Sequence, residues 1–344
     1  MSKQIHGGDV YRHPGVMDFS SNINPLGTPE SVKKAVCDSM EQVSCYPDVF
    51  YSALKTSLAN YEGIAERQLI CGNGAAELIF SFVMALRPRK ALLPIPTFAE
   101  YGQALEAVGC EIVYYPMKEF RIGEEILEQL TPELDMLFLC NPNNPTGFLI
   151  ENRILKMIMD RCKSMQIHLL LDECFLDFVE GGNDFSKKNL ADAYQNIFIL
   201  KAFTKRYAMA GLRLGYGICG NEELLERMSH MVQPWNVSIP AQAAGLAALK
   251  EKDYVKKAQT LVHEERRYLK ESLKNLGFKV YDSQANYIFF QGAQDLYEKC
   301  LEKNIMIRDC SNYPGLEKGF YRVAVRTHDA NCMLIQVLES IVRS

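Results

Sequence analysis

Short apolar runs alternate with longer amphipathic segments through the middle of the chain. This alternation is typical of parallel strands joined by helices. The runs that we expect to form strands lie at 90–94, 111–115, 136–140, 168–172, 197–200 and 214–219. Segments 75–86, 98–108 and 152–165 space their apolar residues as a helix does. The pattern therefore predicts an α/β fold with a mostly parallel sheet flanked by helices.

The pattern changes after Pro234. A helical pattern extends over 239–276 and predicts one long helix, and beyond Gly277 short strands are expected at 287–290, 305–308 and 320–325, with a closing helix from Asp329. This part predicts a smaller α+β domain that the N-terminal segment completes. We expect two domains: a large one over 44–236, and a small one that combines 1–43 with 237–344.

Composition excludes several classes of protein. The 344 residues are 48% hydrophobic and 23% charged with a net charge of −4, so neither nucleic acid nor a membrane surface is indicated as a partner. The N-terminus lacks the apolar core of a signal peptide, and the cytoplasm is the expected location. The 11 cysteines form no Cys-x-x-Cys pair and the six histidines lack metal-ligand spacing, so we expect reduced thiols and no metal site.

Ligands of open parallel sheets bind where the strands end, so the residues after each run are candidates for chemistry. Cys71-Gly-Asn-Gly-Ala-Ala-Glu77 joins glycines to a helix start, which favours a phosphate site, although a simple turn has the same composition. Glu77 replaces the third glycine of a dinucleotide fingerprint, which argues against a nucleotide-dependent dehydrogenase. Further on, Cys140-Asn-Pro-Asn-Asn-Pro-Thr-Gly147 predicts an irregular loop that presents amides at the sheet edge.

Two charged residues follow the later strands. Asp172 ends a buried run, where a carboxylate needs a cation such as a protonated pyridine, unless it merely caps a loop. Lys205 follows the next run and becomes an amine nucleophile if burial lowers its pKa, whereas most lysines are solvated surface charges. Lys201 and Arg206 are alternative candidates in the same segment, and the spacing to Gly211 and Arg213 favours Lys205 as the nucleophile.

The ordered set of motifs resembles the aspartate-aminotransferase-like fold of pyridoxal phosphate enzymes over essentially the whole chain. The set is Gly-Asn-Gly-Ala, Asn-Pro-Asn-Asn-Pro-Thr-Gly, Asp-Glu and Thr-Lys followed after five residues by Gly-Leu-Arg-Leu-Gly. The resemblance implies a large domain with a seven-stranded sheet that binds pyridoxal 5'-phosphate. It also implies a homodimer with active sites at the subunit interface.

The same resemblance assigns roles to individual residues. Lys205 carries the cofactor as a Schiff base, and Asp172 pairs with the pyridine N–H and keeps the ring an electron sink. Asn144 hydrogen-bonds the ring hydroxyl, and Phe98 stacks on the ring. The residues that the resemblance assigns to the cofactor phosphate are Gly74, Ala75, Ala76, Thr204 and Arg213, with Tyr46 reaching it from the neighbouring subunit.

Two arginines in the small domain point to the substrate. Arg322 stands where this fold binds a substrate carboxylate, and Arg308 supplies a second cation, which suits a dianionic substrate. Surface arginines at strand ends are the alternative. The N-terminal His6-Gly-Gly-Asp and Asp18-Phe-Ser-Ser-Asn resemble threonine-phosphate decarboxylases of cobalamin synthesis, in which His6, Asn22 and Arg308 of this chain would contact the substrate phosphate under a covering N-terminal arm.

The resemblance extends to histidinol-phosphate aminotransferases, which share most of these residues. Those enzymes usually have a tyrosine three residues after the pyridine-pairing acid, where this chain has Phe175. Two features argue against the decarboxylase. Segment 10–16 is shorter than expected between the motifs His-Gly-Gly and Asp-Phe-Ser, and Cys174 stands where an alanine is more usual after Asp-Glu. A regulator that retained this fold would carry a DNA-binding domain, and the sequence predicts none. We expect decarboxylation of L-threonine O-3-phosphate, with histidinol-phosphate or related transamination as the alternative.

Overall fold

The computed structural model describes residues 6–343 and contains one large sheet. Its seven strands are β2 Leu69–Asn73, β3 Lys90–Ile95, β4 Glu111–Pro116, β5 Met136–Cys140, β6 His168–Asp172, β7 Ile197–Ala202 and β8 Leu214–Ile218. They lie in the order β2-β8-β7-β6-β5-β3-β4, and β8 runs antiparallel to both of its neighbours while the other pairs are parallel. The mostly parallel seven-stranded sheet is confirmed.

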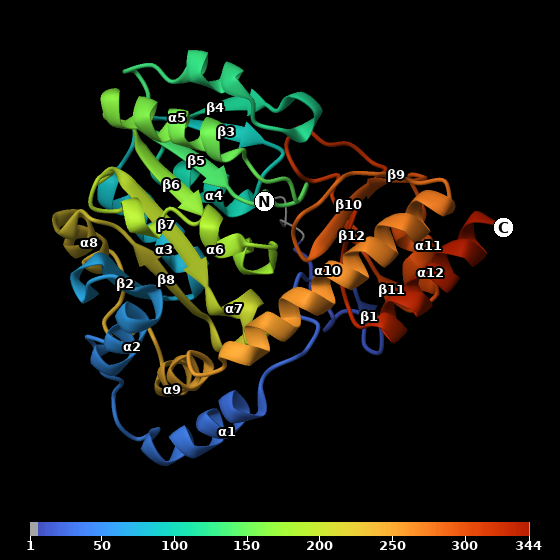
Figure 1. Ribbon diagram of the computed structural model, residues 1–344, viewed down its shortest axis with the longest axis horizontal. Coiled ribbons are helices and arrows are strands. Elements are labelled where there is room, and N and C mark those ends of the chain that lie inside the picture. Colours follow the sequence, from blue (N-terminus) through green and yellow to red (C-terminus); the bar gives the residue numbers. More distant parts are fainter. Residues whose placement is uncertain (1–5, 344) are drawn as a thin grey trace.

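Helices cover both faces of this sheet (Figure 1). The helices are α1 Glu30–Ser39, α2 Ser52–Glu62, α3 Gly74–Leu86, α4 Ala99–Ala107, α5 Asn152–Ser164, α6 Gly182–Phe185, α7 Phe203–Arg206, α8 Glu222–Ser229, α9 Ile239–Ala248, α10 Lys252–Asn275, α11 Leu296–Glu302 and α12 His328–Val342. In β6, Leu169 and Leu171 pack with α2, α5 and α9, whereas Leu170 packs with α3, α4 and α8 on the opposite face. Because both faces are buried, the strands appear in sequence as continuous apolar runs.

The segments outside this sheet form two smaller sheets. Their strands are β1 Met17–Asp18, β9 Lys279–Val280, β10 Tyr287–Gln291, β11 Ile305–Met306, β12 Arg308–Asp309 and β13 Phe320–Ala324. One sheet has the order β12-β13-β10-β9, and the other pairs β1 with β11. Phe19 lies in the core formed by these strands and the helices α10 and α12, so the N-terminal segment and the C-terminal part are packed together.

Two predictions about the C-terminal part are wrong. The single helix over 239–276 is two helices, because the chain turns at 249–251 so that α9 packs against α1 and the large sheet while α10 packs against β10 and α12. The expected strand at 305–308 is also two strands, since β11 pairs with β1 and β12 pairs with β13. Neither break is marked by a glycine or proline. The division into two domains at residues 44 and 237 stays a prediction.

Among residues 6–343, no helix is long and apolar enough to cross a bilayer.

Candidate active site

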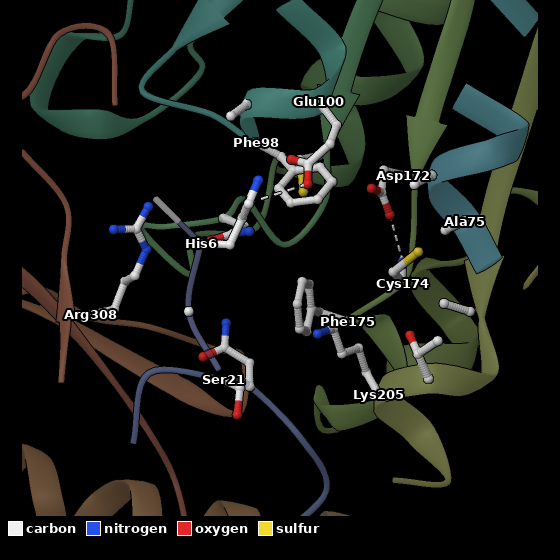
Figure 2. A pocket seen from close by; sticks show the side chains of 18 of the residues that line it. His6, Ser21, Ala75, Phe98, Glu100, Asp172, Cys174, Phe175, Lys205 and Arg308 are labelled. Atoms are coloured by element: carbon white, nitrogen blue, oxygen red, sulfur yellow. Dashed lines mark hydrogen bonds and ion pairs between the residues drawn. The ribbon is translucent and has the colours of Figure 1, made fainter. Parts of the chain in front are cut away.

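A cavity of about 250 Å³ opens where the strands of the large sheet end (Figure 2). Its walls come from the N-terminal segment 6–22, which we call the N-terminal arm, and from the starts of α3 and α4, the ends of β5 and β6, α7 and the smaller sheets. The lining residues are His6, Gly7, Ser20, Ser21, Asn22, Ala75, Ala76, Phe98, Ala99, Glu100, Cys140, Asn144, Asp172, Cys174, Phe175, Ala202, Thr204, Lys205, Arg213, Arg308, Tyr313 and Arg322. The cavity thus gathers side chains from the whole length of the sequence.

Lys205 lies in α7, immediately after β7, and its amine faces this cavity. Burial lowers the pKa of Lys205 to about 8, and the nearby guanidinium group of Arg322 acts in the same direction. A lysine with such a pKa is partly neutral near physiological pH. It can therefore act as a nucleophile toward a carbonyl group and as a proton carrier.

Lys201, the competing lysine, has a different environment. It is fully surrounded by protein, its amine lies 3.3 Å from a carboxylate oxygen of Glu173, and it does not line the cavity. The attraction of Glu173 and Glu62 outweighs the cost of burial and raises the pKa of Lys201, so this amine stays protonated. Lys201 is thereby a structural cation, which leaves Lys205 as the amine available for chemistry.

Asp172 is the last residue of β6 and also lines the cavity. Its Oδ1 accepts a hydrogen bond from the backbone N–H of Cys174 at 2.8 Å, and its Oδ2 accepts one from the hydroxyl of Tyr101 at 2.6 Å. Burial nevertheless raises the pKa of Asp172, because these two hydrogen bonds and the charge of Lys205 compensate the lost hydration incompletely. A cationic group bound beside it would complete that compensation.

The turn between β2 and α3 is shaped for close approach of the backbone. Gly74 has φ +80, and a Cβ there would lie 2.7 Å from an Nη of Arg213. In β8, a Cβ on Gly215 would lie 2.6 Å from the backbone nitrogen of Ala75. The two glycines let the first turn of α3 sit against Arg213. The N–H groups of a first helical turn have no partner within the helix, so this turn is suited to an anion.

Arg322 and Asn144 are bonded to each other at the centre of the site. One Nη of Arg322 donates to the side-chain oxygen of Asn144, and the other donates to the backbone oxygen of Ser20 at 2.7 Å. The buried Nε of Arg322 has no hydrogen-bond partner within residues 6–343. A guanidinium group with an unsatisfied N–H beside a cavity is ready to bind an anionic ligand.

His6 and Arg308 lie on the opposite side of the cavity from Lys205 (Figure 2), and Asn22 also lines the cavity. An Nη of Arg308 donates to the side-chain oxygen of Asn312 at 2.8 Å. The buried side-chain oxygen of Asn22 has no hydrogen-bond partner in the described part of the chain. Burial lowers the pKa of His6, and the positive charge of Arg308 lowers it further, so the imidazole is neutral at physiological pH.

Two of the site residues predicted from the sequence are not in the cavity wall. Gly74 directly precedes the lining residue Ala75 in the sequence. Its contribution is the backbone geometry described above. Tyr46 is 78% exposed and stacks on Trp235 with ring centroids 4.4 Å apart, so it does not reach the cavity of its own chain. The other predicted residues line the cavity together.

Three residues that shape the site were not predicted from the sequence as site residues, namely Glu100, Tyr101 and Cys174. Tyr101 and Cys174 hold Asp172, as described above. Glu100 lies in the first turn of α4, faces the cavity and has one carboxylate oxygen 3.6 Å from Nδ1 of His6. Glu100 and Tyr101 follow Phe98 closely in the segment after β3, and this position at a strand end is the signal that was available for them.

The described residues contain no group of three or more potential metal ligands. Four cations, Lys205, Arg213, Arg308 and Arg322, line the cavity, and such a set favours an anionic ligand.

Known proteins that are similar to this chain place it in one family. The family model for aminotransferase class I and II matches residues 14–338. Threonine-phosphate decarboxylase of Salmonella typhimurium strain LT2 is 39% identical over 352 residues, covering 98% of this chain and 96% of that protein. Among solved structures, histidinol-phosphate aminotransferase from Clostridium acetobutylicum has a TM-score of 0.89 at 30% identity, covering 94% of this chain and 98% of that one. Histidinol-phosphate aminotransferase from Sinorhizobium meliloti in complex with pyridoxal-5'-phosphate has a TM-score of 0.85 at 20% identity, covering 94% and 90%.

Proposed function

Because the chain belongs to the class I and II aminotransferase family, we propose that it is a threonine-phosphate decarboxylase, an enzyme of cobalamin side-chain synthesis. The proposed reaction converts L-threonine O-3-phosphate into (R)-1-amino-2-propanol O-2-phosphate and CO2. The bond from Cα to the carboxylate carbon breaks, and a proton takes the place of the carboxylate on Cα.

Pyridoxal 5'-phosphate is the cofactor. The residues of the cavity fit it, because a buried carboxylate short of cationic partners (Asp172) and an amine of lowered pKa (Lys205) face the same space. Asp172 would pair with the ring nitrogen and Lys205 would hold the aldehyde carbon. The first turn of α3 and Arg213 would bind the phosphate. When bound, pyridoxal phosphate supplies an electron sink for the electron pair of the bond that breaks at Cα.

Asn144 and Phe98 complete the proposed cofactor site. Since Arg322 donates to the side-chain oxygen of Asn144, the amide nitrogen of Asn144 is the end left to donate to the ring oxygen of the cofactor. Phe98 lines the wall next to the start of α4 and makes an edge contact with Tyr101, with ring centroids 5.5 Å apart. Its position is suited to stacking on the face of a ring.

The observation that carries the substrate assignment is the pairing of two buried arginines. Arg308 in β12 lies directly opposite Arg322 in β13, so both side chains leave the same face of the sheet, and both reach the cavity. Two adjacent guanidinium groups favour a ligand with two anionic groups. Phosphothreonine carries two such groups on one molecule, a carboxylate and a phosphate.

The lining residues would then bind different groups of the substrate. Arg322, with its unsatisfied Nε, would bind the carboxylate that leaves as CO2, while Arg308, His6 and Asn22 hold the phosphate. Fixing the substrate at both ends determines which bond to Cα stands perpendicular to the cofactor ring. Lys205, with a pKa of about 8, would then deliver the proton to Cα from its Nζ.

Phe175 supports the same assignment. It lines the cavity and makes an edge contact with Tyr287, with ring centroids 5.1 Å apart and an interplanar angle of 83°. A phenylalanine here offers the cofactor no hydroxyl group. Histidinol-phosphate aminotransferases usually have a tyrosine at this position, so Phe175 favours the decarboxylase over the alternative.

The test is to incubate the purified enzyme, loaded with pyridoxal phosphate, with phosphothreonine and to measure CO2. We expect CO2 and the amino-propanol phosphate in equal amounts, with much slower turnover of L-threonine, which lacks the phosphate. Lys205→Ala is the matched inactive control. If no CO2 is released, and histidinol phosphate is instead turned over in a reaction that depends on a keto acid, the chain is an aminotransferase.

We further propose that the enzyme is a homodimer in which Tyr46 reaches the cofactor phosphate of the other subunit. An exposed apolar surface formed by Val43, Tyr46, Val49, Phe50 and Trp235 supports this, because large apolar surfaces of this kind mark protein contacts. Next to Trp235, Asn236 donates to Glu77 in the first turn of α3, so this surface adjoins the proposed phosphate site. Light scattering after size-exclusion chromatography measures the mass, and a monomer at micromolar concentration would contradict the proposal.

A further inference from the structure

Glu100 is a carboxyl group to which the proposed chemistry gives no role, although it faces the cavity that holds the substrate. Its side chain is 16% exposed, and its Oε1 lies 3.6 Å from Nδ1 of His6 on the N-terminal arm. Its Oε2 is buried and has no hydrogen-bond partner within residues 6–343. Figure 2 shows the carboxyl group above His6, pointing into the cavity. A buried carboxylate oxygen that faces a ligand site without a donor requires an explanation.

The surroundings of Glu100 make its charge easily changed. Burial raises the pKa of Glu100 to about 7, while Lys205 and Arg308 oppose this shift and Asp172 adds to it. The titratable and charged groups that face Glu100 from other elements are His6 of the arm, Asp172 at the end of β6, Lys205 of α7, Arg308 of β12 and Tyr313 of the following loop. Glu100 is therefore half protonated in the unliganded enzyme near neutral pH.

We propose that Glu100 is a substrate-binding residue that takes up a proton when the substrate phosphate enters and then donates a hydrogen bond to a phosphate oxygen as a neutral acid. This inference rests on the proposed function in one respect, namely that the substrate carries a phosphate bound beside His6 and Arg308. The proposal adds a hydrogen bond from a carboxylic acid to the phosphate contacts already proposed for Arg308, His6 and Asn22. It also makes substrate binding depend on pH.

The physical reason is the repulsion between two anions in a site of low dielectric constant. A phosphate beside His6 and Arg308 comes next to Glu100, because His6 lies within 3.6 Å of this carboxyl group and Arg308 lines the same cavity. An ionised carboxylate has no donor to offer and would repel the dianion. One proton removes the repulsion and turns Oε2 into a donor, and hydrogen bonds from donors to phosphate oxygens are among the strong ones.

The experiment measures proton uptake on binding with isopropyl phosphate, a phosphomonoester that resembles the side chain of phosphothreonine and has no amine with which to react. The second pKa of a phosphomonoester is about 6, so at pH 8 the probe is a dianion before it binds. Titration calorimetry of the holoenzyme in two buffers with different heats of ionisation gives the number of protons taken up. Since the pKa of Glu100 is about 7, wild type should take up about 0.9 proton at pH 8, where the probe is already fully ionised.

Three variants identify the group that takes up the proton. Glu100→Gln, which mimics the neutral acid, should take up almost no proton at pH 8 and should bind isopropyl phosphate with less than twofold change between pH 7 and 8. The wild-type affinity should fall about fivefold over the same interval, the ratio expected for a group with this pKa that must be neutral in the complex. Glu106→Gln, which changes an exposed carboxylate on the same helix, should behave as wild type. His6→Gln tests whether the imidazole is the proton acceptor instead.

The outcomes separate this inference from the proposed function. If the probe binds but wild type takes up no proton at pH 8, or if His6→Gln abolishes the uptake while Glu100→Gln retains it, the role of Glu100 is refuted and the phosphate site stands. If isopropyl phosphate does not bind to any of the proteins, the phosphate site fails and the proposed function fails with it. If a variant does not fold, the absence of proton uptake by wild type at pH 8 still refutes the role of Glu100.

Discussion

Substitution of Gly74 by alanine tests whether the first turn of α3 and Arg213 form the binding site for the cofactor phosphate. The new Cβ would lie 2.7 Å from an Nη and 3.1 Å from Cζ of Arg213, closer than real atoms approach. The flexible guanidinium group must therefore move away from the turn. Because Gly74 has φ +80, the alanine also strains the backbone, at a cost of about 1–2 kcal/mol.

Gly63 provides the matched control. It has φ +71 at the end of α2, and a Cβ there would meet no atom within 4 Å. Gly63→Ala therefore carries the backbone strain without the displacement of Arg213. We expect both variants to lose similar stability. Losing the hydrogen bond from Arg213 to the phosphate costs about 1.5 kcal/mol, the low end for charged pairs because Arg213 is exposed.

This energy corresponds to about tenfold weaker binding of pyridoxal phosphate by Gly74→Ala. The apparent Kd is measured by titrating the apoenzyme with the cofactor and following its absorbance, and stability is measured by urea unfolding. Wild-type affinity in Gly74→Ala would refute the assignment of this turn. Equal weakening in Gly63→Ala would show that general destabilisation, and not Arg213, is the cause.

Three further substitutions test two residues of the site and one buried carboxylate outside it. Tyr101→Phe removes the 2.6 Å hydrogen bond to Asp172, so kcat should fall about tenfold with little change in KM, and an unchanged kcat in steady-state assays would contradict a role for this pair. Arg322→Lys replaces a forked donor by a single ammonium group. The KM for phosphothreonine should therefore rise at least about tenfold, while the affinity for pyridoxal phosphate stays the same. A loss confined to cofactor binding would count against Arg322 as the carboxylate ligand. Burial acts to raise the pKa of Glu62, but the charges of Lys201 and Lys188 outweigh burial and lower this pKa to about 2. The ionised carboxylate therefore stabilises the fold above pH 4.5, and this stabilisation is lost as the pH falls toward 2. Urea unfolding should show about 3 kcal/mol of wild-type stability lost across that interval that Glu62→Gln does not lose, and parallel profiles for the two proteins would exclude it.

The inner strands of the large sheet could be predicted because they are buried on both faces and are therefore continuous apolar runs. Residues 136–140 and 168–172 are strands with the expected bounds. Where a boundary depends on packing between distant elements, the sequence carries no local signal. The turn at 249–251 and the split between β11 and β12 are such cases, because each arises from the different partners of the two segments it separates.

The candidate site could be predicted as far as its residues belong to contiguous motifs. Asp172 ends a strand of the sheet and Lys205 and Asn144 follow strands, so their motifs place them at one edge. The state of Glu100 was not predictable, because its raised pKa depends on burial in a cavity closed partly by the N-terminal arm. The bond between Arg322 and Asn144 likewise joins two segments whose proximity only the fold determines.

The central claim is that the amine of Lys205 holds the cofactor, and chemical trapping tests it most directly. Reduction of the holoenzyme with borohydride fixes pyridoxal phosphate to the amine that carries it, and peptide mass spectrometry then identifies the modified lysine. We expect one modified residue per chain, Lys205, with Lys201 unmodified because it is paired with Glu173. Modification of Lys201 or of a surface lysine in place of Lys205, or no modification at all, would contradict the account.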